Sequence, residues 1–176
     1  DVDPDSIVNK TEVGGGGMNA LGCYAITTFR FLFSAEPTRV VTLMERDPNF
    51  KTDRLTTAIF DFPEGQASFL CSSQLVQCQR MQIFGTEGRI EIETPFDTPI
   101  DGPYRVFVDD GGAFAGGPAE VEASDVVNQY TIECDLFSEA IRNGKPPVVP
   151  LEDALENMRA IDALFRSARS GGWEVV

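Results

Sequence analysis

Four consecutive glycines, Gly14 to Gly17, are the first feature of this sequence that could take part in chemistry. A glycine-rich turn at the start of a helix can hold a phosphate on its backbone N–H groups. The dinucleotide-binding form of such a turn requires a buried strand, then the pattern GxGxxG, then a helix. The residues before these glycines read DPDSIVNKTEV and lack the pattern of a buried strand. The sequence therefore favours a close approach of the glycine backbone to another surface over an independent phosphate site.

The composition excludes several kinds of site and partner. The 176 residues contain no histidine, which removes a Ser-His or Cys-His catalytic pair and leads us to expect no catalytic metal. Fourteen basic residues against 28 acidic ones give a net charge of −14, which would repel a nucleic acid. The chain also lacks an apolar run of the roughly 18 residues that a membrane span needs. We expect neither nucleic acid nor membrane as a partner.

The four cysteines, Cys23, Cys71, Cys78 and Cys134, form no CxxC pair, and three of them lie in apolar stretches. This distribution predicts buried free thiols, which suit the cytoplasm. The chain begins with Asp1 rather than Met, so we expect it to be part of a longer protein whose N-terminal signals are not visible.

Three helices are predicted. The first covers residues 18–33, and because it is apolar nearly all round it should be buried on more than one side. The second covers residues 128–142, with Asn128 as a plausible N-cap. The third covers residues 150–170, where acidic residues in the first turn and basic residues in the last match the helix dipole.

The middle of the chain is rich in predicted strands, separated by short turns that imply hairpins. These strands cover residues 40–44, 55–62, 67–75, 81–84, 89–93 and 104–108. Several carry apolar side chains on both faces, as Ile59 and Phe60 illustrate, so both faces of the sheet need cover. We expect an α+β fold: a large open, mostly antiparallel sheet, helices packed on one face, and a second copy of the chain on the other.

Two motifs together resemble a known family. The stretch GGGGMNALGCYAI, followed by FRFLFSAEPTRV, and the closing stretch from NQYTIECDLF to GGWEVV are similar to the second domain of the glucose-fructose oxidoreductase / inositol dehydrogenase (GFO/IDH/MocA) family. The hairpin FGTEGRIEI lies where that family places one. Residues 1–13 are polar and lack a period, so we expect them to be a lead-in linker. The resemblance implies that residues 14–176 form a substrate-binding and oligomerisation domain. It also implies an N-terminal Rossmann domain that is absent from this chain.

The resemblance implies an NAD(P)-dependent oxidoreductase that moves a hydride between the nicotinamide and a sugar, cyclitol or related polyol. NAD or NADP would be bound mainly by the absent N-terminal domain, so the isolated domain should be inactive. For Gly15 and Gly16 the expectation is limited to a main-chain approach to that cofactor. An alternative is a non-catalytic homologue used for ligand sensing or assembly.

The family places an Asp, and four residues later a His or Tyr, on the helix after the glycines. This spacing is about one turn, so both side chains share a face. Tyr24 matches the second position, where it would handle the substrate proton, but Ala20 stands at the first. Ala20, Thr27, Asn128 and Tyr130 are the expected substrate contacts. Other roles remain open: Tyr24 as a core aromatic, Thr27 bonded back to its own helix, and Asn128 and Tyr130 as cap and core.

Overall fold

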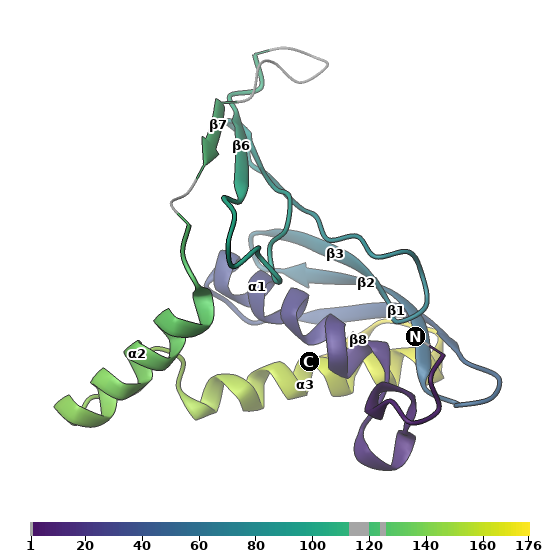
Figure 1. The fold of residues 1–176 in the computed structure, drawn as a ribbon. Helices are drawn as coiled ribbons and strands as arrows, with labels where there is room; N and C mark the ends of the chain where they lie inside the picture. The colour runs from purple at the N-terminus through teal and green to yellow at the C-terminus, as the bar shows by residue number, and fades with distance from the viewer. Residues whose placement is uncertain (1, 113–119, 124–125) are drawn as a thin grey trace. The chain divides into compact units, whose positions relative to one another are not determined.

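The computed structural model describes residues 2–112, 120–123 and 126–176 (Figure 1). The chain divides into two compact units, which are described separately. Residues 1–76 and 149–176 form the first, called here the terminal unit, and residues 77–148 form the second, called the middle unit. The terminal unit thus joins the two ends of the described chain around one core.

The terminal unit is built on a four-stranded antiparallel sheet in the order β3-β2-β1-β8. Its strands are β1 (Arg39–Arg46), β2 (Asp53–Phe62), β3 (Gly65–Ser72) and β8 (Glu174–Val175). The side chains alternate along β2, so that Ala58, Phe60 and Phe62 are buried on one face while Ile59 is exposed on the other. This period of two is what a sheet covered on one face requires.

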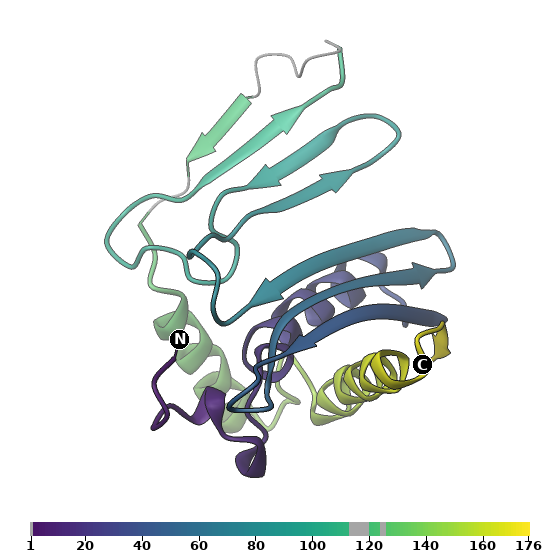
Figure 2. The same cartoon turned by 90° about the vertical axis from the view of Figure 1, so that its right-hand side faces the viewer.

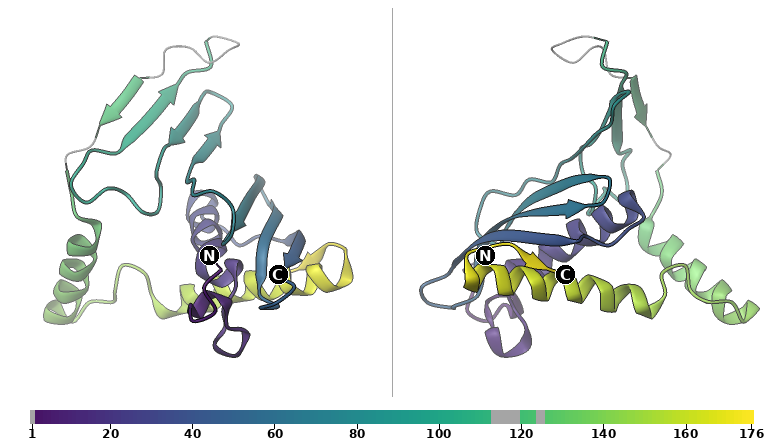
Figure 3. Two further views of the ribbon diagram at one scale, coloured as in Figure 1. Left: turned by 45° about the vertical axis from the view of Figure 1, so that its right-hand side comes forward. Right: turned by 180° about the vertical axis from the view of Figure 1, so that it is seen from behind.

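Two helices, α1 (Cys23–Phe33) and α3 (Leu151–Ser170), lie against the covered face (Figures 2 and 3). Aromatic rings join α1 to β2: Phe29 meets Phe60 edge-on at 5.5 Å between centroids, and Phe33 stacks on Phe62 at 4.4 Å. From α3, Ile161 and Leu164 complete the core. This packing places α1, which follows the glycines, directly on the sheet.

The opposite face of this sheet is open in the single chain. Leu43, Ile59 and Leu70 are 80 %, 41 % and 61 % exposed there. The outer side of α1 is exposed as well, at Tyr24, Phe31 and other positions, so the helix is buried on one side only within the terminal unit. The expectation that it would be buried on more than one side is not met by the residues of the terminal unit.

The middle unit contains a second four-stranded antiparallel sheet in the order β4-β5-β6-β7. Its strands are β4 (Met81–Phe84), β5 (Arg89–Ile92), β6 (Arg105–Asp109) and β7 (Glu120–Ala123), and α2 (Gln129–Asn143) follows them. Ion pairs connect neighbouring strands on one face, among them Arg89 to Asp109 at 3.1 Å. The other face carries Ile83, Ile90 and Val108.

The predicted α+β class, the antiparallel pairing and the three helices are confirmed. The strands belong to two sheets of four, where the sequence predicted one large sheet. The separation begins at Ser72, whose Oγ accepts the backbone N–H groups of Gln74 and Leu75 at 3.1 Å each. Such a local turn competes with ladder pairing and ends β3 three residues before the predicted boundary.

The cysteines differ in part from expectation. All four are free thiols, as predicted. Cys23 and Cys71 are half-buried, but Cys78 and Cys134 are exposed, so the prediction of burial was wrong for these two. The reason for Cys134 is that α2 has no buried residue on any side within the described chain. Burial raises the pKa of the Cys71 thiol to about 12, which makes it a poor nucleophile.

Candidate functional site

The glycine turn packs against other parts of its own chain. Gly14 and Gly16 have φ angles of 77° and 129°, which other residues rarely adopt. A side chain at Gly15 would overlap the carbonyl oxygens of Ile7 and Lys10, and one at Gly16 would overlap the carboxylate of Asp53. The glycines at these positions therefore have a packing reason that is independent of any cofactor.

Asp53, the first residue of β2, lies directly beneath the glycine turn and is 2 % exposed. Its Oδ2 accepts the backbone N–H of Met18 at 2.5 Å. Burial raises the pKa of the Asp53 carboxyl above its ordinary value, while the N–H groups of Met18 and Gly17 act in the opposite direction. A carboxylate of the chain thus occupies the place at this helix start where a bound anion would lie.

The predicted helix over 18–33 starts with a π-helical turn, η3 (Met18–Gly22), which continues into α1. Met18, Gly22 and Ile26 face the core. A side chain at Gly22 would stand 2.8 Å from Met18 Sδ and 3.3 Å from Phe69 on β3, so the helix lies very close to the sheet here. Single π turns are rare and are often found at functional sites.

Tyr24 is the second residue of α1, two positions after the π segment, and is 54 % exposed. It is not a core aromatic of the terminal unit. Ala20, four residues earlier, is half-buried. Thr27 is exposed, but its hydroxyl donates to the Cys23 carbonyl at 3.0 Å, which is the back-bonded arrangement considered for it. The structure therefore presents Tyr24 outward on a helix whose inner side is held by the sheet.

Asn128 and Tyr130 lie in the other unit, at the start of α2. The Asn128 side chain accepts the N–H groups of Tyr130 and Thr131 at 3.0 and 3.2 Å, so its predicted role as an N-cap is confirmed. Tyr130 is exposed and is not a core residue of α2. The structure brings Ala20, Tyr24 and Thr27 together on one helix, and separately places Asn128 beside Tyr130.

The structural roles of two charged residues were not predicted from the sequence. Asp53 holds the helix start, and Arg30 is buried on α1 with ion pairs to Glu36 and Asp153. A signal existed in each case. Asp53 is an acidic residue at the start of the apolar strand, and Arg30 is the only cation in the apolar helix.

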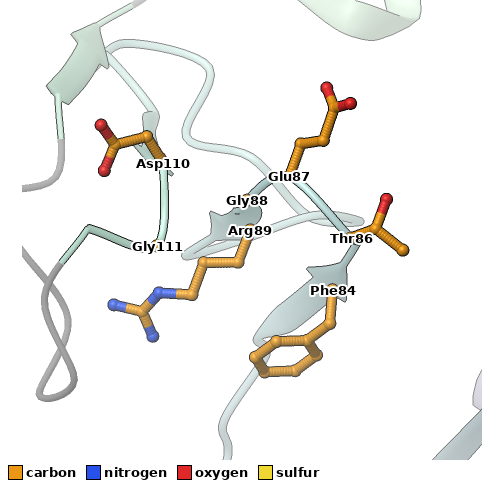
Figure 4. Close-up of a pocket in the computed structure, with 8 residues that line it drawn as sticks. Phe84, Thr86, Glu87, Gly88, Arg89, Asp110 and Gly111 are labelled. Carbon is orange, nitrogen blue, oxygen red and sulfur yellow. The ribbon is translucent and has the colours of Figure 1, made fainter.

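A hollow in the middle unit lies between the β4–β5 turn and the end of β6 (Figure 4). Phe84, Glu87, Arg89 and Asp110 are among the residues that line it. The Arg89 guanidinium already pairs with the buried carboxylate of Asp109, so its charge is compensated within the sheet. None of the predicted site residues lines the hollow.

The described part of the chain contains neither a cluster of metal ligands nor a membrane-spanning helix. Among residues 2–112, 120–123 and 126–176, no three His, Cys, Asp or Glu side chains come close enough together to hold a metal ion. No described helix combines the length and the apolar character needed to span a membrane.

Comparison with known proteins now decides the family. The model of the GFO/IDH/MocA C-terminal domain matches residues 1–91, just over half of the chain. The chain belongs to the GFO/IDH/MocA family. The resemblance inferred from the glycine and C-terminal motifs is thereby confirmed.

Curated relatives of this GFO/IDH/MocA chain are oxidoreductases. An uncharacterized oxidoreductase of Rhizobium meliloti is 40 % identical over 176 residues, covering 99 % of this chain and 53 % of the relative. A D-xylose 1-dehydrogenase (NADP(+)) of Haloferax volcanii is 27 % identical over 169 residues, covering 95 % of this chain and 50 % of the relative. The chain spans about half the length of the curated relatives it matches.

Solved structures of oxidoreductases share the fold of this chain. The aldose-aldose oxidoreductase of Caulobacter crescentus, complexed with glycerol, has a TM-score of 0.84 at 27 % identity, over 99 % of this chain and 52 % of that one. The 3-ketoreductase KijD10 of Actinomadura kijaniata, in complex with NADP and TDP-benzene, has a TM-score of 0.83 at 19 % identity, over 94 % and 50 %. The second likeness shows the fold alone.

Proposed function

We propose that residues 14–176 are the substrate-binding and oligomerisation domain of an NAD(P)-dependent oxidoreductase that acts on a sugar, cyclitol or related polyol. The observation that carries the proposal is the outward position of Tyr24 on a helix whose start and inner face are held by the sheet. The names of two relatives, a D-xylose dehydrogenase and an aldose-aldose oxidoreductase, support the substrate class. The test is the reduction of NAD or NADP by the intact protein with a panel of sugars and polyols.

In the proposed reaction, Tyr24 handles the proton of the substrate hydroxyl. The nicotinamide, held mainly by the nucleotide-binding domain, would supply the hydride acceptor for the carbon that bears this hydroxyl. Tyr24 relays the hydroxyl proton as the carbonyl forms, and in the reverse direction donates it to the carbonyl oxygen. A lysine of the nucleotide-binding domain is the partner that the family resemblance implies. Ala20 leaves room on the same face one turn earlier, where a substrate group would stand.

We propose that the nucleotide-binding domain covers the exposed apolar side of the two helices. Phe31 on α1, and Leu155 and Met158 on α3, are exposed apolar residues of the terminal unit. A monomeric surface rarely leaves this kind of side chain uncovered in groups. Contact there would bring the cofactor to Tyr24. We further expect the protein to act in the cytoplasm, where its four free thiols would stay reduced.

We expect the 176-residue chain by itself to bind neither NAD nor NADP measurably. The backbone N–H of Met18 already donates to Asp53, and the glycine turn is filled by the chain's own atoms. Isothermal titration calorimetry checks this. Binding in the micromolar range would contradict the assignment of the cofactor to another domain. It would indicate that Gly15 and Gly16 bind the cofactor directly.

We expect two copies of the chain to associate through the open face of the terminal sheet. Leu43, Ile59 and Leu70 form the apolar part of this face, and a two-fold contact should bury on the order of 1,000 Å² or more. Because the contact is apolar, it should persist at high salt. Leu43→Asp should dissociate it, whereas Val76→Asp, a change at a still more exposed position outside the face, should not.

Sedimentation equilibrium at low and high ionic strength measures this association. A single species of 19.2 kDa at micromolar concentration in both conditions would contradict the proposed dimer. Dissociation by salt alone would indicate a contact held by charges instead.

A non-catalytic homologue is the second candidate function. Ala20 favours it, because the family's Asp is absent at that position. Such a protein would bind its ligand without reducing NAD or NADP, so the activity assay on the intact protein separates the two candidates.

A further inference from the structure

We infer that Asp53 is a positioning residue, which fixes the start of the helix that carries Tyr24 and thereby sets where the Tyr24 phenol stands. The inference rests on the proposed catalytic function of Tyr24. Asp53 itself lies beneath the glycine turn, 2 % exposed, and therefore acts through the helix and not on the substrate.

The contact between Asp53 and the helix start is close on several sides. Oδ2 accepts the Met18 N–H at 2.5 Å, and Oδ1 occupies the space that a side chain at Gly16 would take. A side chain at Gly17 would stand 3.2 Å from the Asp53 carbonyl oxygen. A negative carboxylate at this end of a helix is also stabilised by the helix dipole. The helix start can therefore neither slide nor rotate without breaking this arrangement.

Asp53 can serve as an anchor because its own backbone is held. The turn before it is closed by Asp47, whose Oδ1 accepts the N–H groups of Asn49 and Phe50 at 2.7 and 2.9 Å. The Asp47 N–H donates to the Thr52 carbonyl at 2.8 Å. On the other side, the Arg54 carbonyl accepts the Ser72 hydroxyl at 2.6 Å. The anchor thus belongs to the sheet and not to a loose loop.

The position of Met18 is transmitted to Tyr24 over a short distance along the chain. Tyr24 follows Met18 by six residues, through the π turn η3 and the first residue of α1. Between them, Gly22 lies against Phe69 and Cys71 of β3. Two points of the helix start, Met18 and Gly22, are therefore tied to neighbouring strands. Loss of the first would leave the helix free to turn about the second, and Tyr24 would move with it.

The test compares Asp53→Asn and Asp53→Ala with Ser167→Ala. The Asn variant keeps the shape and one acceptor oxygen but loses the charge. Ser167 is also fully buried and binds backbone, since its Oγ accepts the Thr42 N–H at 3.0 Å, but it lies on α3. Ser167→Ala is therefore the control: it also removes a buried hydrogen bond from the terminal unit, but at a position away from the helix start. Thermal unfolding of each variant shows whether the stability losses are comparable.

We expect Asp53→Ala to lower kcat of the intact enzyme roughly 100-fold, the effect of misplacing a catalytic group by about 1 Å, with KM for the cofactor unchanged. The kcat of Asp53→Asn should lie between those of Asp53→Ala and the wild type. In the NMR spectrum of the chain, both variants should shift the Met18 amide and the Tyr24 ring signals, and Ser167→Ala should leave these signals in place.

The spectra and the kinetics have separate consequences. Unchanged Met18 and Tyr24 signals in Asp53→Asn would overturn the inference, even if Asp53→Ala does not fold. An equal loss of kcat in Ser167→Ala would also overturn it, because the effect would then follow stability and not position. Shifted signals in a protein that reduces neither NAD nor NADP would refute the proposed function while supporting the anchoring of Tyr24 by Asp53.

Discussion

Tyr24→Phe is expected to lower kcat of the intact oxidoreductase roughly 10²- to 10⁴-fold, the range for loss of a general acid-base group. The variant keeps the aromatic ring and removes only the hydroxyl that would exchange a proton with the substrate. Tyr24 is 54 % exposed on α1, so the loss of this hydroxyl should not unfold the core. Steady-state kinetics with the best sugar or polyol substrate gives the measurement.

Tyr104→Phe is the matched control, because it removes the phenol of a tyrosine that is not among the proposed site residues. This control should retain the wild-type kcat. If Tyr24→Phe also retains it, Tyr24 has no part in proton transfer. A raised KM with an unchanged kcat would indicate that the hydroxyl binds substrate equally in the ground and transition states.

Arg30→Ala should lower the free energy of unfolding by about 3 kcal/mol, the lower end of the range for breaking a buried ion pair. The Arg30 side chain is 6 % exposed, and its Nε and Nη2 bind the two carboxylate oxygens of Glu36 at 2.7 and 2.8 Å. Nη2 also pairs with Asp153 at 2.9 Å, which ties α1 to the first turn of α3. The lower end applies because both carboxylates are partly exposed and can regain water.

Arg39→Ala is the comparison for burial. Arg39 pairs with Asp61 at a similar distance, 2.8 Å, but its side chain is 53 % exposed. Its removal should cost below about 1 kcal/mol. Urea denaturation gives both values, provided that the m-value is unchanged. Equal losses in the two variants would contradict the view that burial, and not the ion pair alone, makes Arg30 important.

The hydrogen bonds to Glu36 above all raise the pKa of Arg30, so its charge persists throughout the accessible pH range.

Much of the fold could be predicted from the sequence because its determinants are local. The period of two along LTTAIFDF predicts a strand, and Phe60 and Ile59 indeed lie on opposite faces of it. Asn128 caps α2 through bonds to residues two and three positions away. The family could be inferred for a similar reason, since its motifs are short continuous stretches.

The candidate site depended more on contacts between distant residues. The sequence suggested that the glycines approach another surface, but it did not indicate that the surface is Asp53, 35 positions from Met18. It marked Arg30 as polar in an apolar helix, but not its partner Asp153, 123 positions away. It also predicted one sheet. The hydroxyl of Ser72 ends β3 by binding the backbone after it, but in the sequence Ser72 cannot be told from any other polar residue of a strand.

Periodicity, capping and turns involve residues within a few positions of one another, so the sequence by itself determined the α+β class, the helices and the hairpins. Which buried charge meets which backbone group, and where a strand leaves its sheet, depends on how those elements pack. Only the tertiary structure decided these points: it alone placed Asp53 under the glycine turn and Tyr24 on the outer side of α1. The physical reason is that a buried carboxylate is stable only beside donors that the completed fold brings to it.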